Sequence, residues 1–357
     1  MNRKSIHLTH SRLTIYICQF AILLSVLLLA GCAGEKHPHG QRRSKASLLT
    51  PTSSGNPYEV MVVADDSVYK GYAGKALQTI LDYPLLGLPQ AEPQFHKSHI
   101  TQKSYNKITN IFRNIVRINI SREYTKAKMT VEHDVHSTPQ LIITVQGPNQ
   151  VVVSQYITEH TRDITSLITS QEINTMANNL YYEHNVKFAK KVKEMFDCEL
   201  YIPVDINKMK IGKDFIWASD DGLSVIQNIC IYSLPYVSEK MLTRNPYIAL
   251  RDKVMAENIP GGHEGSVMRT NHEFVWTKNR RVRDDVAMEA RGLWEMSVEA
   301  MGGPFVSHSR IDTVNSRIIV VEGFVYAPDK MKRTMLRRLE AALYTLELPT
   351  DTKTKQQ

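Results

Sequence analysis

The stretch "FVSHSRIDTVNSRIIVVEGFVYA", residues 305–327, contains the two segments that say most about the fold. Each segment is strand-like, and the first alternates in side-chain character with the period of two that is typical of a β-strand. Asn315-Ser316 lies between them, and so short a link predicts a tight hairpin. The neighbouring segments 266–277 and 281–296 are also strand-like. An antiparallel sheet is therefore predicted in the C-terminal half of the chain.

The first of these strands is predicted to have one polar face. Alternation places His308, Arg310 and Asp312 together on it. Glu295 and Glu322 are expected to join them from other strands. A histidine, an arginine and carboxylates on one sheet face suit a sugar or an acidic ligand. The alternative, which we favour, is a solvent-exposed face with cross-strand ion pairs, because charged alternation is routine on antiparallel sheets.

Strand-like segments form groups along the whole chain, and helical patterns lie between the groups. In the N-terminal half, residues 58–64 and 113–121 are predicted strands, and segments 129–135 and 140–147 form a predicted hairpin. One long amphipathic helix is expected to end near Asp197. This order predicts the α+β class, with antiparallel sheets that each carry helices on one face. The form that we favour is a duplicated, ferredoxin-like arrangement with one copy in each half.

The last predicted helix begins with an unusual concentration of positive charge. Lys330, Lys332 and Arg333 lie in its first turn, and only Asp329 offsets them. Cations at this end oppose the helix dipole. A basic helix start would suit an anionic partner. The alternative is a tolerated solvent-exposed face, which we favour because the penalty is small.

The N-terminus has the layout of a lipoprotein signal peptide. A basic start is followed by an apolar run over 20–30 and by small residues before Cys32. In proteins with the motif Leu29-Ala30-Gly31-Cys32, the cysteine sulfur receives a diacylglycerol, and cleavage makes the cysteine the first residue. Its amine then usually takes a further fatty acyl chain, such as palmitate. The alternative is an uncleaved membrane span, and both alternatives tether the protein to a membrane.

Composition and patterning divide the chain into five parts. Residues 33–57 are rich in proline, glycine, serine and basic residues and lack an apolar period, which is typical of a flexible tether. The hydrophobic content of 42% and the charged content of 22% are those of an ordinary globular protein. The predicted parts are a signal peptide (1–31), a tether (32–57), an N-terminal α+β subdomain (58–197), a C-terminal α+β subdomain (198–349) and a polar tail (350–357).

Charge and cysteine content restrict the partners. The formal charge of +8 includes three cations of the signal peptide, so the mature chain carries 8 − 3 = +5. This mild excess suits anionic headgroups or polymers better than nucleic acid, which an exported protein seldom meets. With Cys18 removed and Cys32 lipidated, Cys198 and Cys230 remain. Whether they form a disulfide or pack as thiols stays open at this point.

No catalytic or metal-binding signature occurs in the sequence. His263-Glu264 and His272-Glu273 lack the second histidine of a zinc peptidase motif. The nucleophile elbow and the phosphate-binding loop are missing as well. We therefore expect no metal, no cofactor and no catalytic residue of a known type.

Several longer phrases in the C-terminal half resemble a known family. They are "GKDFIWASDD" (212–221), "IPGGHEGSVM" (259–268), "GLWEM" (292–296), "MGGPFVSH" (301–308) and "EGFVYAPDKMKR" (322–333). Together with the motif at Cys32, they resemble bacterial envelope lipoproteins that are defined only as a domain of unknown function. The resemblance implies a lipoprotein of the Gram-negative cell envelope, and it brings no catalytic residues with it.

Two hypotheses for the function follow. The first is a lipid-anchored binding or interaction module whose partner is another envelope protein or an anionic polymer. The second is a membrane-tethered enzyme that acts on an envelope glycan or polymer through Glu295, His308, Arg310, Asp312 or Glu322. No acidic cluster follows Cys32. An acidic cluster at this place would be a signal for export to the cell surface. Because it is missing, we expect an outer-membrane location that faces the periplasm.

Overall fold

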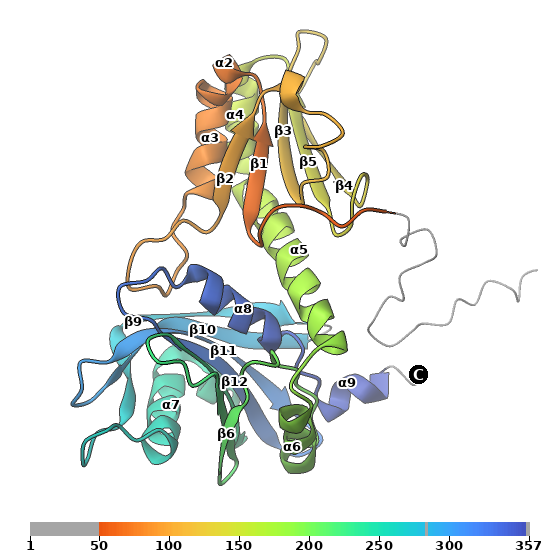
Figure 1. The fold of residues 1–357 in the computed structure, drawn as a ribbon. Coiled ribbons are helices and arrows are strands. Elements are labelled where there is room, and N and C mark those ends of the chain that lie inside the picture. Colours follow the sequence, from red (N-terminus) through yellow and green to blue (C-terminus); the bar gives the residue numbers. More distant parts are fainter. Residues whose placement is uncertain (1–49, 283–284, 355–357) are drawn as a thin grey trace, which may run out of the picture. The chain divides into compact units, whose positions relative to one another are not determined.

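Two β-sheets and the helices that cover them make up the described part of the protein, which belongs to the α+β class as predicted (Figure 1). The structure is a computed structural model that describes residues 50–282 and 285–354, all within one compact unit. Cys32, the predicted signal peptide and most of the predicted tether lie outside the described residues. None of the described helices has the length and apolar composition needed to cross a bilayer.

The first sheet has five strands in the order β2-β1-β3-β5-β4. Their bounds are β1 (Glu59–Val63), β2 (His96–Ile100), β3 (Asn114–Ile120), β4 (Lys128–His133) and β5 (Leu141–Gly147). The predicted hairpin is confirmed, because β4 pairs antiparallel with β5. The prediction of a fully antiparallel sheet is wrong here, because β1 pairs parallel with β2 and β3, and β3 pairs parallel with β5. Strands that are apolar on both faces are typical of parallel pairing, and β1 is such a run.

Helices cover one face of this first sheet, as predicted. They are α3 (Tyr72–Leu81), α4 (Gln150–Glu159) and α5 (Thr161–Tyr182), with the short α2 (Asp66–Tyr69) before them. Their apolar residues share one core with the strands, for example Leu77 and Ile157 with Val60 and Val62. A small cluster around Ile115 lies on the other face, beside the 3₁₀ turn η3 (Gln102–Ser104).

The long helix predicted to end near Asp197 is in fact two helices. α5 ends at Tyr182, and α6 (Val186–Phe196) begins after Asn185. The Asn185 side chain accepts a hydrogen bond from the Phe188 amide at 3.0 Å, so it caps the second helix. α6 packs in the core of the second sheet through Phe188, Val192 and Phe196.

The second sheet has seven strands, and every neighbouring pair is antiparallel. In spatial order they are β6 (Lys208–Gly212), β7 (Phe215–Ser219), β8 (Ile226–Pro235), β12 (Arg317–Tyr326), β11 (Gly302–Asp312), β10 (Asp285–Met296) and β9 (Met268–Val282). The hairpin of β11 and β12 is confirmed, but residues 313–316 link the strands, so the loop is longer than the predicted Asn315-Ser316. The two sheets differ in strand order and direction, so they are not two copies of one arrangement.

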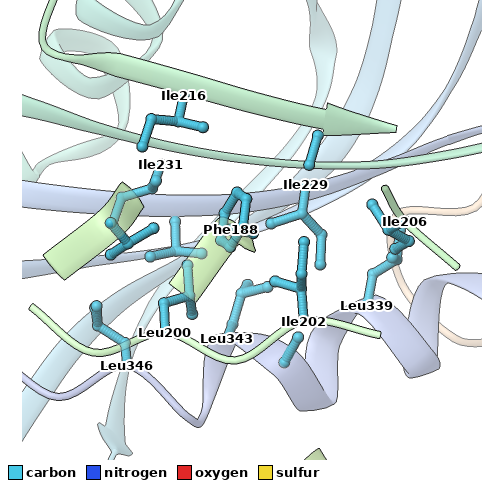
Figure 2. Packing of buried hydrophobic residues seen from close by; sticks show 14 of the residues in the cluster. Phe188, Leu200, Ile202, Ile206, Ile216, Ile229, Ile231, Leu339, Leu343 and Leu346 are labelled. Atoms are coloured by element: carbon cyan, nitrogen blue, oxygen red, sulfur yellow. The ribbon is translucent and has the colours of Figure 1, made fainter. Parts of the chain in front are cut away.

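Helices lie on both faces of the second sheet, which corrects the prediction of one covered face. α7 (Arg244–Asn258), after the turn η4 (Glu239–Leu242), lies on one face, and α8 (Arg333–Leu343) lies on the other (Figure 1). Alternation along β12 explains this, because Val320 packs with the α7 core and Val321 packs with the α8 core. Figure 2 shows the core between α8 and the second sheet, where Leu339 and Leu343 of α8 face Ile229 and Ile231 of β8.

The predicted polar tail begins as a short helix, α9 (Pro349–Thr354). One of its side chains, Asp351, forms an ion pair with Arg310 of β11, with Nη2–Oδ1 at 2.7 Å. The start of the tail is therefore attached to the second sheet.

Candidate functional site

The five polar residues predicted as a ligand face do not lie in one place. His308, Arg310 and Asp312 share the α8 face of β11 and are fully buried. Glu322 is the register partner of Ser307, which puts it on the opposite face, toward α7. Glu295 lies at the end of β10 and is partly exposed beside Arg269. The burial of the three β11 residues differs from both expectations, the groove and the solvent-exposed face.

Arg310 and Asp312 each have charged partners inside the protein. Arg310 donates to Asp351 and to Asp285 Oδ2 at 3.1 Å. Asp312 Oδ2 accepts from Arg317 Nε at 2.9 Å and from Asn315 Nδ2 at 2.8 Å. These contacts tie β11 to its hairpin loop and to α9, so both residues serve the architecture.

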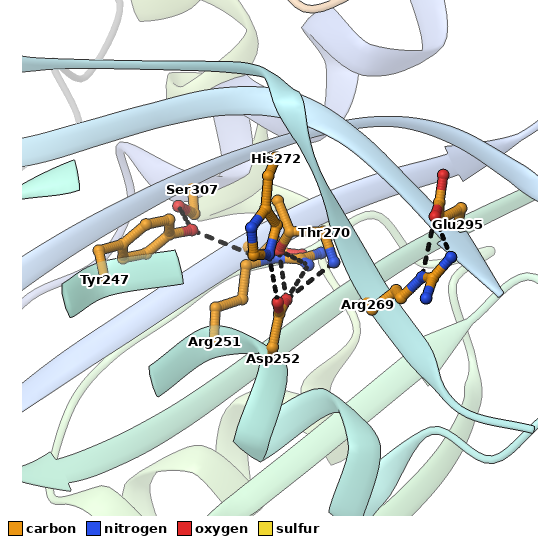
Figure 3. A network of polar contacts seen from close by, with 9 residues as sticks. Tyr247, Arg251, Asp252, Arg269, Thr270, His272, Glu295 and Ser307 are labelled. Atoms are coloured by element: carbon orange, nitrogen blue, oxygen red, sulfur yellow. Dashed lines mark hydrogen bonds and ion pairs between the residues drawn. The ribbon is translucent and has the colours of Figure 1, made fainter. Parts of the chain in front are cut away.

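Glu322 belongs to a buried polar cluster between α7 and the second sheet. Figure 3 shows this cluster around Arg251, with Tyr247, Thr270 and Ser307. Arg251 donates to its carboxylate twice, from Nε at 2.9 Å and from Nη2 at 2.6 Å. The third nitrogen of Arg251, Nη1, donates to Thr270 Oγ1 at 2.8 Å, and the guanidinium lies 4.1 Å from the centre of the Phe305 ring. Tyr247 and Ser307 complete the cluster through their hydroxyl groups.

The same network continues to the surface, where each charged group still has a polar partner. Asp252 Oδ1 accepts from the Thr270 amide at 2.8 Å, and Asp252 Oδ2 lies 3.0 Å from His272 Nε2. Two carboxylates therefore accompany the one buried arginine. Because the charged groups are paired and hydrogen-bonded, we interpret this cluster as structural.

A second buried cluster, on the α8 face, is not matched in this way. Glu289 of β10 accepts from Arg291 Nε at 2.9 Å and forms an ion pair with Lys278 Nζ at 3.2 Å. Glu340 of α8 accepts from Arg291 Nη2 and from Arg337 Nη1, the latter at 2.9 Å. Both carboxylates are almost fully buried.

Arg280 also belongs to this cluster, and His308 lies next to Glu289 at its buried end. Arg280 Nε is 3.4 Å from Glu289 Oε2. His308 Nε2 is 3.8 Å from the same oxygen, which is too long for a hydrogen bond, and its ring packs edge-on against Tyr344. His308 is therefore a buried neighbour of the cluster, covered by Glu289 and α8.

Positive charge is in excess in this cluster. Lys278, Arg280, Arg291 and Arg337 face the two carboxylates, so 4 − 2 leaves two positive charges. Arg291 Nη1 and Arg337 Nε have no hydrogen-bond partner among the described residues. The excess comes from Lys278 and Arg280, whose side chains are partly exposed, and an anion that binds beside them would balance it.

The neighbouring positive charges also lower the pKa values of the two carboxylates. Burial alone would raise the pKa of Glu289, but Arg291, His308 and Arg280 together outweigh it, and the pKa lies well below its usual range. The pKa of Glu340 is lowered in the same way, since Arg291 and Arg337 outweigh the effect of burial. Both carboxylates therefore stay ionised at neutral pH, and the cluster remains positive overall.

The four cations open onto a pocket of about 200 Å³, which we call the basic pocket. Lys278 is the most exposed of them, with 56% of its side chain accessible, whereas Arg291 is only 6% accessible. The remaining lining comes from α5 and from the segment after α3: Tyr83, Pro84, Leu85, Leu86, Gln94, Thr165, Ser166 and Thr169. Guanidinium and ammonium groups together with hydroxyl donors suit a phosphate or a carboxylate.

The segment between α3 and β2 holds one wall of the basic pocket in place. Its Glu92 carboxylate accepts from the amides of Lys332 and Arg333 at 2.6 and 2.8 Å, and so caps the start of α8. Gly87 of the same segment has a φ of +86°, and a Cβ there would lie 3.1 Å from the Arg291 Cβ. Glycine therefore permits both the turn and the close approach to β10.

Sequence reasoning missed Glu289, Arg291 and Glu340. A signal was present for two of them, because Glu289 and Arg291 alternate with the apolar Met288 and Ala290 along a predicted strand. Charged alternation usually marks an exposed face, which hid their burial. No local pattern brings α8 to this face, since Arg291 and Glu340 are 49 residues apart.

The two cysteines of the described region are free and buried. Burial raises the pKa of the Cys198 thiol to about 12, and its Sγ lies 3.1 Å from the Phe196 carbonyl oxygen. Burial also raises the pKa of Cys230 well above its usual value. Both thiols therefore stay protonated and pack as small apolar groups.

The fold and the pocket define an α+β protein with two unlike sheets and a basic pocket that the second sheet, α8, α5 and the segment after α3 line together. Comparison with protein families gives two matches, one for each sheet. Residues 53–181 match a domain of unknown function (DUF8532), and residues 185–345 match another (DUF4837). These matches confirm the expectation of domains without an assigned function. No curated protein matches the chain.

Proposed function

We propose that this protein is a lipid-anchored binding module of the cell envelope and that its basic pocket holds an anionic group of the ligand. The excess of two positive charges in the basic pocket carries this proposal. Two guanidinium nitrogens without partners lie in the same cluster. Charge-assisted hydrogen bonds to a phosphate or carboxylate would satisfy such donors.

The composition of the pocket favours binding over catalysis. Among the residues that line the basic pocket in the described structure, there is no carboxylate, histidine or cysteine. A hydrolase needs a general base or an activated nucleophile within reach of the bond that breaks. His308, one of the residues that the enzyme hypothesis named, is fully buried beside Glu289.

Removing the two more accessible cations tests the binding role. We expect Lys278→Gln with Arg280→Gln to weaken the binding of inorganic phosphate at least about tenfold, because each lost charge-assisted hydrogen bond costs about 1.5–3 kcal/mol. Isothermal titration calorimetry at low ionic strength measures the change. Both side chains are partly exposed, so we expect the variant to fold.

A charge-matched variant provides the control. Lys208→Gln with Arg281→Gln removes the same two residue types from exposed positions outside the basic pocket. Phosphate affinity should stay within about twofold of the wild type, since only long-range screening changes. Equal losses in both variants, or no phosphate binding by the wild type, would contradict the proposed pocket.

The anchor is proposed from the sequence, with Cys32 as the lipidated residue. We expect Cys32→Ser to move the protein from the membrane fraction to the soluble fraction, because two or three acyl chains anchor stably and their loss leaves only weak contacts. Fractionation of envelopes from the native host followed by immunoblotting measures this. Retention of the variant in membranes would favour an uncleaved span.

The location and partners proposed with this function are the outer membrane, facing the periplasm, and an envelope component that carries negative charge. The basic residues of the segment 33–57 and the net charge of about +5 support an anionic partner. An envelope protein or an anionic polymer would both present such groups.

A further inference from the structure

A second pocket of about 690 Å³ adjoins the basic pocket. It runs between α3 on one side and α4 with the start of α5 on the other, and we call it the helix groove. It shares Tyr83, Gln94 and Thr165 with the basic pocket. A ligand held in the basic pocket could therefore extend into the helix groove.

Most of the accessible surface that lines the helix groove is apolar. Tyr72 and Tyr83 leave 70% and 60% of their surface exposed, and Ala76 and Ile80 lie between them on α3. Exposed aromatic surface of this extent often marks a binding site. Lys75 is the charged residue of the lining, and its aliphatic stem can lie along an apolar chain.

The four threonine hydroxyl groups of the helix groove are already engaged. Thr79 donates to the Lys75 carbonyl at 2.9 Å, Thr158 to that of Ser154 at 2.9 Å, and Thr165 to that of Thr161 at 2.8 Å. Thr161 donates to the Thr158 carbonyl at 2.8 Å. Because these protons are used within the helices, the threonines offer no free donor to the hydroxyl groups of a sugar.

We infer that the ligand is an anionic amphiphile, with its charged head in the basic pocket and its hydrocarbon chain along the helix groove. This inference rests on the proposed function and adds the chemical class of the ligand. Charge complementarity fixes the head, since four of the five cations that line the combined cavity lie in the basic pocket. The chain follows from the apolar lining and the engaged threonine hydroxyl groups.

Calorimetric titration with octyl phosphate and methyl phosphate, both monomeric in solution, tests the inference. The two probes share one head and differ only in the chain. We expect octyl phosphate to bind about 100-fold more tightly, because each buried methylene adds a several-fold gain. Octanoate in a parallel titration distinguishes a carboxylate head from a phosphate head, and glucose 1-phosphate represents a sugar ligand.

Two substitutions block the helix groove from opposite walls. Ala76→Trp on α3 and Thr158→Trp on α4 should each reduce octyl phosphate affinity at least about tenfold and leave methyl phosphate affinity unchanged. Val151→Trp is the control, since Val151 is 62% exposed on α4 and does not line the groove. Circular dichroism verifies that each variant is folded.

The outcomes separate this inference from the proposed function. If octyl and methyl phosphate bind equally, if both groove variants keep full octyl phosphate affinity, or if glucose 1-phosphate binds as tightly as octyl phosphate, the amphiphile is ruled out. The basic pocket then still stands, provided that Lys278→Gln with Arg280→Gln weakens methyl phosphate binding. Failure of both phosphates to bind would overturn the proposed function as well.

Discussion

Glu322→Gln is expected to lower the free energy of unfolding by about 3–5 kcal/mol, because it leaves a buried arginine without its counter-charge. Arg251 and Glu322 are both fully inaccessible to solvent and share two hydrogen bonds. Glutamine keeps the shape of the side chain but loses the charge. Chemical denaturation measures the change as a lower midpoint at an unchanged slope.

The exposed pair of Arg269 and Glu295 gives a matched control on the same sheet. Its side chains are 54% and 33% accessible, so Glu295→Gln should cost less than about 1 kcal/mol. Replacing both buried partners, with Arg251→Met and Glu322→Leu, should recover most of the loss, since no unpaired charge remains. Similar losses for Glu322→Gln and Glu295→Gln would contradict the structural role of the α7 cluster.

Glu340→Gln should have the second largest effect, a loss of about 3 kcal/mol, and phosphate should partly restore the stability. Glu340 accepts from both Arg291 and Arg337, so its loss raises the unmatched positive charge. An anion in the basic pocket would replace it. The melting temperature of the variant should therefore rise more steeply with phosphate concentration than that of the wild type.

Acid provides an independent check on Glu340. Its pKa is lowered in the folded protein because Arg291 and Arg337 outweigh burial, so its contribution to stability is present above the unfolded value of about 4.5. That contribution disappears as the pH falls through the lower, folded pKa. The stability difference between wild type and Glu340→Gln should therefore shrink as the pH falls below about 4.5. A difference that grows in acid would contradict this account.

An exposed glutamate controls for the loss of charge in general. Glu194 of α6 pairs with Lys191 at the surface, where their side chains are 49% and 32% accessible. Glu194→Gln should change the melting temperature little and should not alter its dependence on phosphate. If phosphate raises the stability of Glu340→Gln no more than that of Glu194→Gln, the anion does not occupy the basic pocket.

The sequence predicted the strands of the second sheet well because each one alternates or is strongly apolar. Alternation also grouped His308 with Arg310 and Asp312, and these residues do share a face of β11. It did not predict that α8 and α9 would bury this face. Helix packing is decided by contacts between distant segments, such as the pair of Arg310 and Asp351, and no local pattern records it.

The basic start of α8 shows the same limit of local patterns. Lys332 and Arg333 oppose the helix dipole when the helix is considered alone. In the fold, Glu92 caps their amides from 240 residues away, and both side chains are buried. The parallel strands of the first sheet left a clearer trace, since the apolar run of β1 is typical of a strand covered on both faces.

The central claim is that the basic pocket binds an anionic group, and a crystal soaked in tungstate, a heavy-atom analogue of phosphate, tests it most directly. We predict an anomalous peak within hydrogen-bond distance of Arg280 and of the guanidinium groups of Arg291 or Arg337, and loss of that peak in Lys278→Gln with Arg280→Gln. A basic pocket without tungstate in wild-type crystals, alongside peaks at other surface cations, would contradict the account.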